Sequence, residues 1–224
     1  GECPYKSPTD MGVNMVGCCI FDDAAVCDAA RQEIVRRYYS ALSDRRQGQT
    51  GDETVYKLEL LMQQAKVTAD IRPVIAASLQ VADETGNPAG AIELPDGEIV
   101  TGKTTDLMGA SSATLLNALK RLAHIDHEKH LISPEAIAPI QAVKVDHLGS
   151  ANPRLHSDEV LIALAISAAT DPLAARALEQ LSNLRGCEAH SSVILSPVDS
   201  VTYGKLGMHL TCEPQYETNK LYHR

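Results

Sequence analysis

The chain has 224 residues, 44% of them hydrophobic, which is enough to bury a full core as one domain or as a domain with a smaller lobe. Its 29 acidic and 20 basic residues give a net charge of -9 without a long basic run, which argues against nucleic-acid and acidic-membrane partners. The longest apolar stretch, residues 160–169, is about half of what a bilayer span requires. We therefore expect a cytoplasmic protein with no membrane partner.

The six cysteines do not have the spacing of a disulfide framework or of a zinc site. They include no Cys-x-x-Cys pair, and Cys18 and Cys19 are adjacent, which is a poor geometry for two ligands of one metal ion. We expect reduced thiols and no bound metal. The chain begins with Gly1 rather than a methionine and shows no signal-peptide pattern, so we expect a trimmed or partial product.

Residues 1–86 are predicted to form a loop followed by three helices. The first 20 residues contain prolines and glycines with little periodicity, which is typical of a loop. Apolar residues then recur every four positions up to residue 47, and further helical patterns begin at Asp52 and near residue 70. Gly86-Asn87-Pro88 ends the third pattern, and we place the end of a helical subdomain there.

Beyond residue 87, strand and helix patterns alternate. In chain order, the predicted elements are a strand hairpin at 91–94 and 98–102, a helix at 112–123, a strand at 130–133, a helix from 134 that Pro139 bends or ends early, helices at 157–169 and 172–184, a strand at 189–195, a helix from 196 to 206 and a strand at 208–212. This alternation predicts an α/β (α+β) fold class, with a three-layer α/β/α subdomain around a mixed sheet over residues 87–214. A polar tail at residues 215–224 follows.

The same order of elements is that of the cytidine-deaminase-like fold, in which a catalytic zinc ion lies where two helix N-termini meet. The ligands are missing here, because the first helix start carries Ser111 and Ser112 and the second carries Ser133-Pro134-Glu135. We predict this topology without zinc ligands and without an identifiable cofactor. Helix starts rich in hydroxyls suit either ordinary capping or an anion such as phosphate or carboxylate.

The segment from Gly97 to Thr104 matches the letters of a phosphate loop, but its context favours the hairpin. A phosphate loop is small and flexible between its glycines, whereas residues 98–101 are Glu, Ile, Val and Thr, which suit a strand. A nucleotide-triphosphatase role is therefore the secondary interpretation. Lys103 and Thr104 stay candidates for anion binding outside such a loop.

Polar residues also gather at the start of the most apolar helix. In the segment 152–159, Arg154 offers a planar fork for carboxylate or phosphate, and His156 titrates near neutral pH. Helix capping is the alternative role of this segment. By contrast, His124, His127 and His130 would fan over about 120° on a helix, so we do not expect them to share a metal ion.

A second polar cluster combines Arg185, Cys187 and His190 within six positions. A cysteine and a histidine three residues apart can form a nucleophile and base in a turn. In a regular strand they would face opposite sides of the sheet, so the geometry stays open.

Five phrases of the sequence resemble those of one protein family. They span residues 7–14, 32–39, 93–97, 152–159 and 185–190. Together they resemble uncharacterised protein family 0371 over nearly the whole chain from Tyr5 to Pro214. The resemblance implies that the chain is the C-terminal half of a bacterial protein about twice as long, whose additional N-terminal half is absent here. It also implies a helical subdomain before a deaminase-like α/β subdomain, and it brings no established activity.

We therefore predict half of a cytosolic bacterial enzyme that binds a small anionic ligand, for example a nucleotide-like or phosphorylated one. The alternative is a non-catalytic module whose helical part assembles subunits, and either way we expect a homo-oligomer. The candidate residues are His156, His190 and Cys187 for catalysis, and Lys103, Thr104, Arg154, Arg185, Asp10 and Asn14 for ligand binding. In an enzyme, Lys103, Arg154, His156 and His190 should converge on one cleft.

Overall fold

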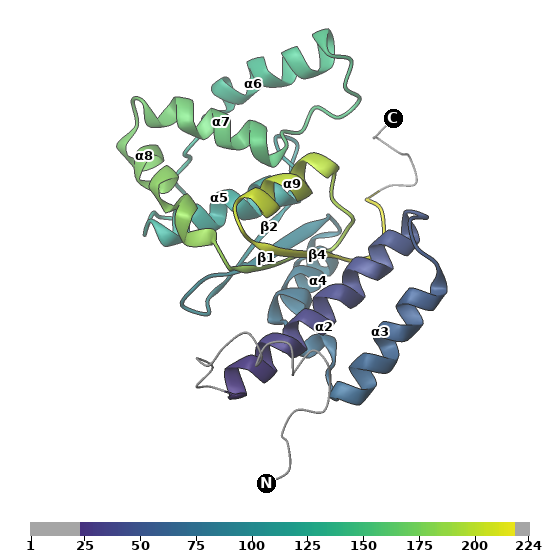
Figure 1. Ribbon diagram of the computed structural model, residues 1–224. Helices are drawn as coiled ribbons and strands as arrows, with labels where there is room; N and C mark the ends of the chain where they lie inside the picture. Colours follow the sequence, from purple (N-terminus) through teal and green to yellow (C-terminus); the bar gives the residue numbers. More distant parts are fainter. Residues whose placement is uncertain (1–22, 218–224) are drawn as a thin grey trace.

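The computed structural model describes residues 23–217, in which helices cover both faces of one four-stranded sheet (Figure 1). The predicted α/β class is confirmed. No helix within this range combines the length and the apolar content of a bilayer span. In chain order the elements are α2 (Asp23–Arg46), α3 (Asp52–Ala65), the 3₁₀ turn η1 (Ala69–Ile71), α4 (Pro73–Thr85), β1 (Ala89–Glu93), β2 (Ile99–Lys103), α5 (Ala110–Leu122), α6 (Pro134–Ala142), the π-helical turn η2 (Val143–His147), α7 (Ser157–Ala168), α8 (Pro172–Leu178), the 3₁₀ segment η3 (Glu179–Leu184), β3 (Glu188–Ser191), α9 (Pro197–Lys205) and β4 (His209–Cys212).

The sheet has the strand order β2-β1-β3-β4. Strand β1 is antiparallel to both of its neighbours, whereas β3 and β4 run parallel, so the sheet is mixed as predicted. Strands β1 and β2 form the expected hairpin, closed by a turn in which Gly97 has a φ of +83° and donates its N–H to Leu94 O over 2.9 Å. That left-handed conformation favours glycine, and the turn takes the place of a phosphate loop.

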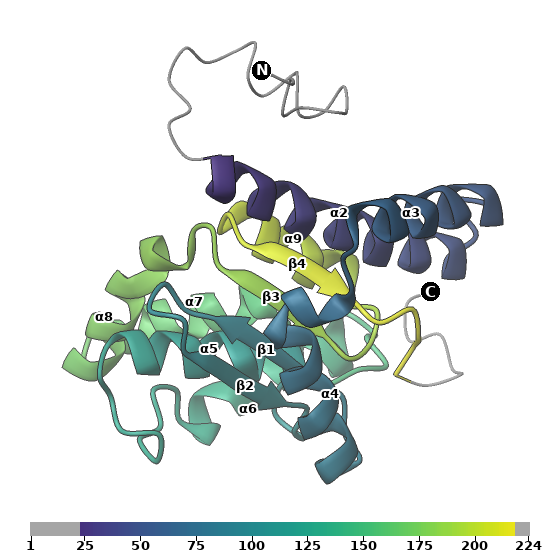
Figure 2. The same ribbon diagram turned by 90° about the horizontal axis from the view of Figure 1, so that it is seen from below.

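The two faces of the sheet are occupied by different helices (Figure 2). Helices α2 and α4 lie on one face, and α5 and α9 lie on the other. Because side chains alternate along a strand, Ile92 and Ala189 join the core beneath α5, while His190 and Thr211 face α2. Gly102 lets α5 approach β2 closely, since a Cβ there would lie 2.4 Å from Thr114 N.

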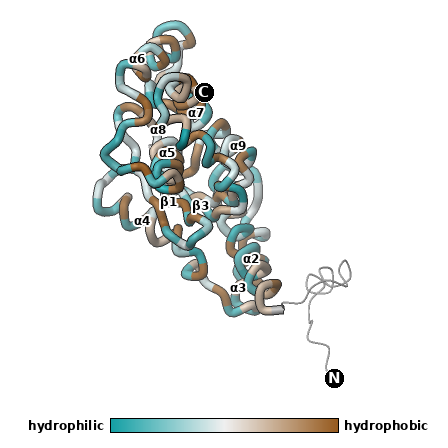
Figure 3. The backbone as a smooth tube through the Cα atoms, turned by 90° about the vertical axis from the view of Figure 1, so that its left-hand side faces the viewer, coloured by the Kyte–Doolittle hydropathy of each residue, from teal (hydrophilic) through white to brown (hydrophobic). Residues whose placement is uncertain are grey.

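Two apolar clusters support this arrangement. The larger one joins the sheet to α5, α6, α7, α8 and α9, and its hydrophobic positions run through β1 and β3 in the middle of the molecule (Figure 3). The smaller one, around Val35 and Ile75, joins α2, α3 and α4. Helix α4 lies in the segment predicted as a helical subdomain, yet it packs directly on β1. The boundary between 86 and 87 stays a prediction.

Several predicted elements differ from the structure, including the helix predicted over 172–184, which ends at Leu178 and continues as the 3₁₀ segment η3. Residues 130–133 do not form a strand; Leu131 and Ile132 are buried in the larger cluster as part of a loop. A short apolar run cannot by itself distinguish a strand from another buried segment. Strand β3 ends at Ser191 rather than near residue 195. Of the two outcomes predicted for Pro139, a bend or an early end, the early end does not occur, because the helix continues to Ala142 and into η2.

A buried arginine links the helical layer to the sheet. Arg72 is 1% exposed, and its Nη2 lies 2.7 Å from Glu188 Oε2 and donates to His209 O over 3.1 Å. Its Nη1 donates to Thr211 Oγ1. The other oxygen of Glu188 pairs with Arg36 Nη1 at 2.5 Å, so one carboxylate on β3 holds both α2 and the start of α4. A cation is tolerated this far from water because it is paired and hydrogen-bonded.

We expect Arg72→Met to lower the free energy of unfolding by about 3 kcal/mol, because it removes the partner of Glu188 Oε2 and of the strand carbonyls and leaves Glu188 paired with Arg36 alone among the described residues. Urea unfolding at neutral pH measures this loss. Arg37→Met is the matched control: its side chain is 69% exposed and pairs with Glu33, so the loss should stay below about 1 kcal/mol. Equal losses in the two variants would contradict the linking role of Arg72.

Candidate functional site

Three helix starts meet around one cavity on the α5 face of the sheet. Its volume is about 300 Å³, and its wall includes residues at the starts of α5, α7 and α9. Each helix N-terminus carries a partial positive charge and unpaired N–H groups. The wall residues from these starts are Gly109, Ala110, Ser111, His156, Ser196 and Asp199.

Hydrogen bonds tie the three starts together. Leu155, which immediately precedes the start of α7, accepts at its carbonyl from Gly109 N over 3.3 Å and from Ser112 Oγ over 2.9 Å, which joins α7 to α5. Tyr203 of α9 donates its hydroxyl to Ser111 O over 2.8 Å, and burial raises the pKa of that phenol. The position of each start is therefore fixed by a neighbouring helix.

Asp199 joins α7 to α9. Its carboxylate is 5% exposed and accepts from Ser157 N over 2.8 Å, from Ser157 Oγ over 2.6 Å and from Ser196 Oγ over 2.7 Å. His156 Nδ1 lies 3.0 Å from Oδ2. Burial by itself raises the pKa of Asp199, but the hydrogen bonds from His156, Ser157 and Ser196 outweigh it and hold the pKa well below its usual range. The carboxylate is therefore ionised at neutral pH.

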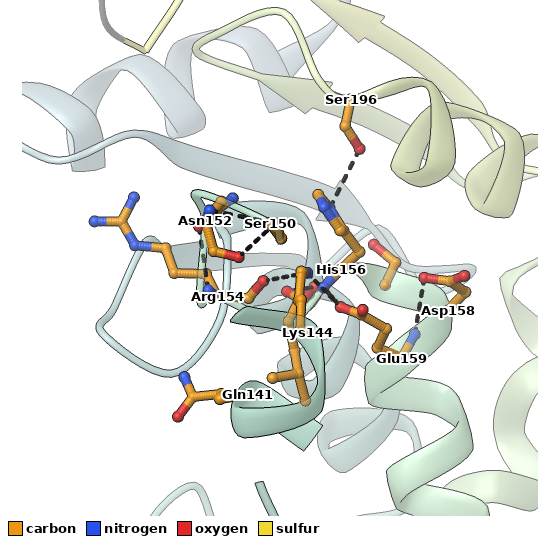
Figure 4. A network of polar contacts seen from close by, with 12 residues as sticks. Gln141, Lys144, Ser150, Asn152, Arg154, His156, Asp158, Glu159 and Ser196 are labelled. Carbon is orange, nitrogen blue, oxygen red and sulfur yellow. Dashed lines mark hydrogen bonds and ion pairs between the residues drawn. The ribbon is translucent and has the colours of Figure 1, made fainter. Parts of the chain in front are cut away.

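His156 turns one edge of its ring to this carboxylate, and Nδ1 also lies 3.3 Å from Ser196 Oγ (Figure 4). Because an ionised carboxylate can only accept, Nδ1 carries a proton. The hydrogen bond to Asp199 raises the pKa of His156 against the opposing effect of burial. Among residues 23–217, Nε2 has no hydrogen-bond partner, and the side chain is 20% exposed at the cavity wall. Nε2 is the atom of this ring that can exchange a proton with a ligand.

A buried lysine fixes the loop that leads into α7 (Figure 4). Lys144 Nζ donates to Arg154 O over 2.7 Å and to Glu159 Oε2 over 2.7 Å. The same Glu159 oxygen accepts from His156 N over 2.7 Å. These bonds fix the backbone of Arg154 and His156 next to the cavity. Arg154 N also donates to Asn152 Oδ1 over 3.1 Å.

Sequence reasoning missed Lys144 and Asp199. Lys144 carries no local signal, because its partners lie 10 and 15 residues away. Asp199 stands three residues after Ser196, and such a Ser-x-x-Asp spacing is a helix-capping signature. The spacing accounts for the N-cap bond from Asp199 N to Ser196 Oγ at 3.1 Å, but not for the contact with His156.

Three predicted site residues lie on the cavity wall: Thr104, Arg154 and His156. Lys103 is exposed at the end of β2 and is not part of the wall, and Arg185 is exposed in the turn before β3. Asp10 and Asn14 lie outside the described residues. Of the four residues expected to converge, the structure brings together Arg154 and His156.

His190 and Cys187 lie away from this cavity. His190 is 1% exposed on the α2 face, where its Nδ1 lies 2.8 Å from Thr211 Oγ1 and its ring packs edge-on against Tyr39. Burial lowers its pKa. Cys187 belongs to the larger apolar cluster, and burial raises the pKa of its thiol. The two side chains leave the chain on opposite sides, as strand alternation dictates.

Within residues 23–217, no group of three or more His, Cys, Asp or Glu side chains is arranged to hold a metal ion. His124, His127 and His130 therefore do not form such a group. The chemistry of the cavity, as far as these residues provide it, is that of a paired histidine, an arginine and helix-start amides.

Comparison with known proteins gives two family models that match consecutive parts of the chain. Residues 70–222 match the family model "Domain of unknown function DUF1846, C-terminal", and residues 1–66 match "Domain of unknown function DUF1846, N-terminal". The chain belongs to this family. The two models meet just before Arg72, the residue that anchors the start of α4 to the sheet.

Curated relatives carry the name expected from the resemblance. The chain is 54% identical over 224 residues to "UPF0371 protein" of Corynebacterium glutamicum (strain R) and 52% identical to "UPF0371 protein" of Streptococcus pneumoniae (strain Hungary19A-6). Each alignment covers 100% of this chain and 45% of the relative. The chain thus spans about half the length of these relatives, and the resemblance to family 0371 is confirmed.

We expect His156 to titrate above its ordinary pKa of 6.5, and we expect Asp199→Asn to lower that pKa because the variant removes the negative charge that stabilises the imidazolium. NMR titration of the histidine ring protons measures both values. Asp158→Asn is the matched control, since it removes a charge from the same helix turn but from an exposed side chain that accepts from Glu159 N. An Asp199→Asn variant with the wild-type titration would contradict the pairing.

The pair should also make stability depend on pH. Stability from the raised pKa of His156 is full below 6.5 and is lost as pH rises through the folded-state value. Stability from the lowered pKa of Asp199 is full above 3.8 and is lost as pH falls through its folded-state value. Both contributions are full between these limits, so the loss of stability in Asp199→Asn, measured by urea unfolding, should be largest near pH 5.

Proposed function

We propose that the cavity binds a small anionic ligand and that His156 transfers a proton to or from it. One observation carries the proposal: Asp199 holds the imidazole at Nδ1 and leaves Nε2 without a partner in the described part of the chain, at the wall of the cavity. A histidine whose Nδ1 is held by a carboxylate presents its Nε2 for general acid–base catalysis. Protonated Nε2 would act as the acid and neutral Nε2 as the base.

The start of α5 is suited to binding an anion. Ala110 and Ser111 line the cavity, their amides have no hydrogen-bond partner among residues 23–217, and the first turn of α5 contains no acidic residue. The other two starts differ, because Asp199 accepts from Ser157 N at the start of α7 and Ser196 Oγ accepts from Asp199 N at the start of α9. A phosphate or carboxylate oxygen would satisfy the amides of α5 and complement the positive end of the helix.

Arg154 and the cavity size narrow the ligand class. A guanidinium at the wall provides a bidentate partner for carboxylate or phosphate. A volume of about 300 Å³ is at the lower end of small-molecule sites, which favours a phosphate ester or a small carboxylate over a dinucleotide. We infer a cytosolic enzyme of which this chain is the C-terminal half; of this, the length of the relatives supports only that the chain is about half of a longer protein.

We expect a melting-temperature screen against sugar phosphates, nucleotides and small carboxylates to find a stabilising ligand. At about 100 times its dissociation constant such a ligand adds about 2.7 kcal/mol to the free energy of unfolding. Arg154→Ala should abolish the stabilisation, because it removes the guanidinium of the wall. Lys103→Ala should leave it unchanged, because Lys103 lies outside the wall. Stabilisation that survives Arg154→Ala, or that depends on Lys103, would contradict this site.

A structural module is the second candidate, and the outer face of α7 favours it. Ile162 and Ile166, one turn apart, are 60% and 67% exposed on a helix whose other face belongs to the core. A helix that is apolar on all sides is ordinarily covered. A homo-oligomer assembled through α7 would cover it.

We expect sedimentation velocity to show an assembly larger than a monomer if this second candidate is right, and we expect Ile162→Lys to dissociate it by placing a charge in an apolar interface. Leu79→Lys is the matched control, because Leu79 is 37% exposed on α4, on the other face of the sheet. A wild-type chain that sediments as a monomer would contradict assembly through α7.

A further inference from the structure

The last described residues of the chain lie across the same cavity. Tyr216 and Glu217 are part of its wall. Gln215 holds the segment through its backbone and its side chain: Ile194 N donates to Gln215 O over 2.7 Å, and Gln215 Nε2 donates to Ser192 O over 2.7 Å. The guanidinium carbon of Arg46 lies 5.5 Å from the ring centre of Tyr216, which adds a contact from α2.

This segment presents a carboxylate to the arginine of the cavity. Glu217 Oε1 lies 2.6 Å from Arg154 Nη1. No other carboxylate among residues 23–217 pairs with Arg154. A carboxylate on a guanidinium is the contact that an anionic ligand would make at this position. Glu217 therefore shows which chemical group fits there, a carboxylate or a phosphate oxygen.

The pair is weak enough to be displaced. The two side chains are 32% and 34% exposed, and water screens an ion pair of this exposure. The anchors at Gln215 and Tyr216 keep Glu217 near Arg154 even when the ion pair opens, so the carboxylate competes at a high local concentration.

We propose that Glu217 is an internal competitor, which occupies the anion position on Arg154 until a ligand displaces it. The inference rests on the proposed function of the cavity. Because only molecules with a free Arg154 bind the ligand, the apparent affinity is reduced by the fraction in which the pair is closed. The segment 213–217 thereby sets the ligand concentration at which the site fills.

The test compares the full 224-residue chain with its Glu217→Ala variant by isothermal titration with inorganic phosphate and with acetate, at neutral pH and at an ionic strength held constant with chloride. We expect Glu217→Ala to bind at least one of the two anions about threefold more tightly, as expected if Arg154 is paired in about two thirds of the molecules. Glu179→Ala removes the same charge from an exposed position on η3 and should show no gain. Arg154→Ala, combined with Glu217→Ala, should abolish the gain.

The outcomes separate the two proposals. Equal affinity of the wild type and Glu217→Ala would overturn the internal competitor and leave the anion site standing. An equal gain in Glu179→Ala would also overturn it, because the effect would then come from net charge alone. If neither anion binds to the wild type or to Glu217→Ala, the anion site fails and the competitor fails with it.

Discussion

The carboxylate of Asp199 is the contact on which the cavity depends. It is almost fully buried, and a charge in that position is stable only when donors surround it. The donors come from Ser157 at the start of α7, from Ser196 at the start of α9 and from His156. Satisfying one carboxylate therefore fixes the distance between two helix starts and the orientation of one imidazole. The start of α5 is joined separately, through Leu155 and Tyr203, and the amides of Ala110 and Ser111 there have no partner in the described chain.

A second buried ion pair lies on the opposite face of the sheet, where it joins helices to strands. Arg72, Glu188 and Arg36 attach α2 and α4 to strands of only four or five residues. His190 lies in the same layer, beneath Tyr39, where its nitrogens are held by Thr211 and Glu213. His190 is enclosed by packed side chains on this face, whereas His156 borders the cavity at the starts of α5, α7 and α9. Residue types associated with catalysis thus occur on both faces, but of these two histidines it is His156 that borders the cavity.

The cationic side chains around the cavity are paired with carboxylates of the chain itself. Asp199 neutralises His156 and two helix starts, Glu159 neutralises Lys144, and Glu217 neutralises Arg154. Asp199 and Glu159 are each held by several hydrogen bonds, while Glu217 makes one ion pair, with Arg154. Exposure decides which of these pairs a ligand can replace, because a buried pair cannot be broken without leaving a charge without a partner.

By itself, the sequence determined the local structure: helix starts such as Ser196-Pro197, the hairpin around Gly97, the α/β class, the family, and the presence of Arg154 and His156 at one helix start. These follow from turn chemistry, capping and the periods of helices and strands, which act over a few residues. Only the tertiary structure decided that Asp199, 43 residues from His156, is its partner, that Lys144 supports the loop from behind, that residues 130–133 pack as a loop, and that His190 faces away from the cavity. Those contacts depend on how distant helices pack on the sheet and on which side of β3 each residue lies, and no local pattern specifies either.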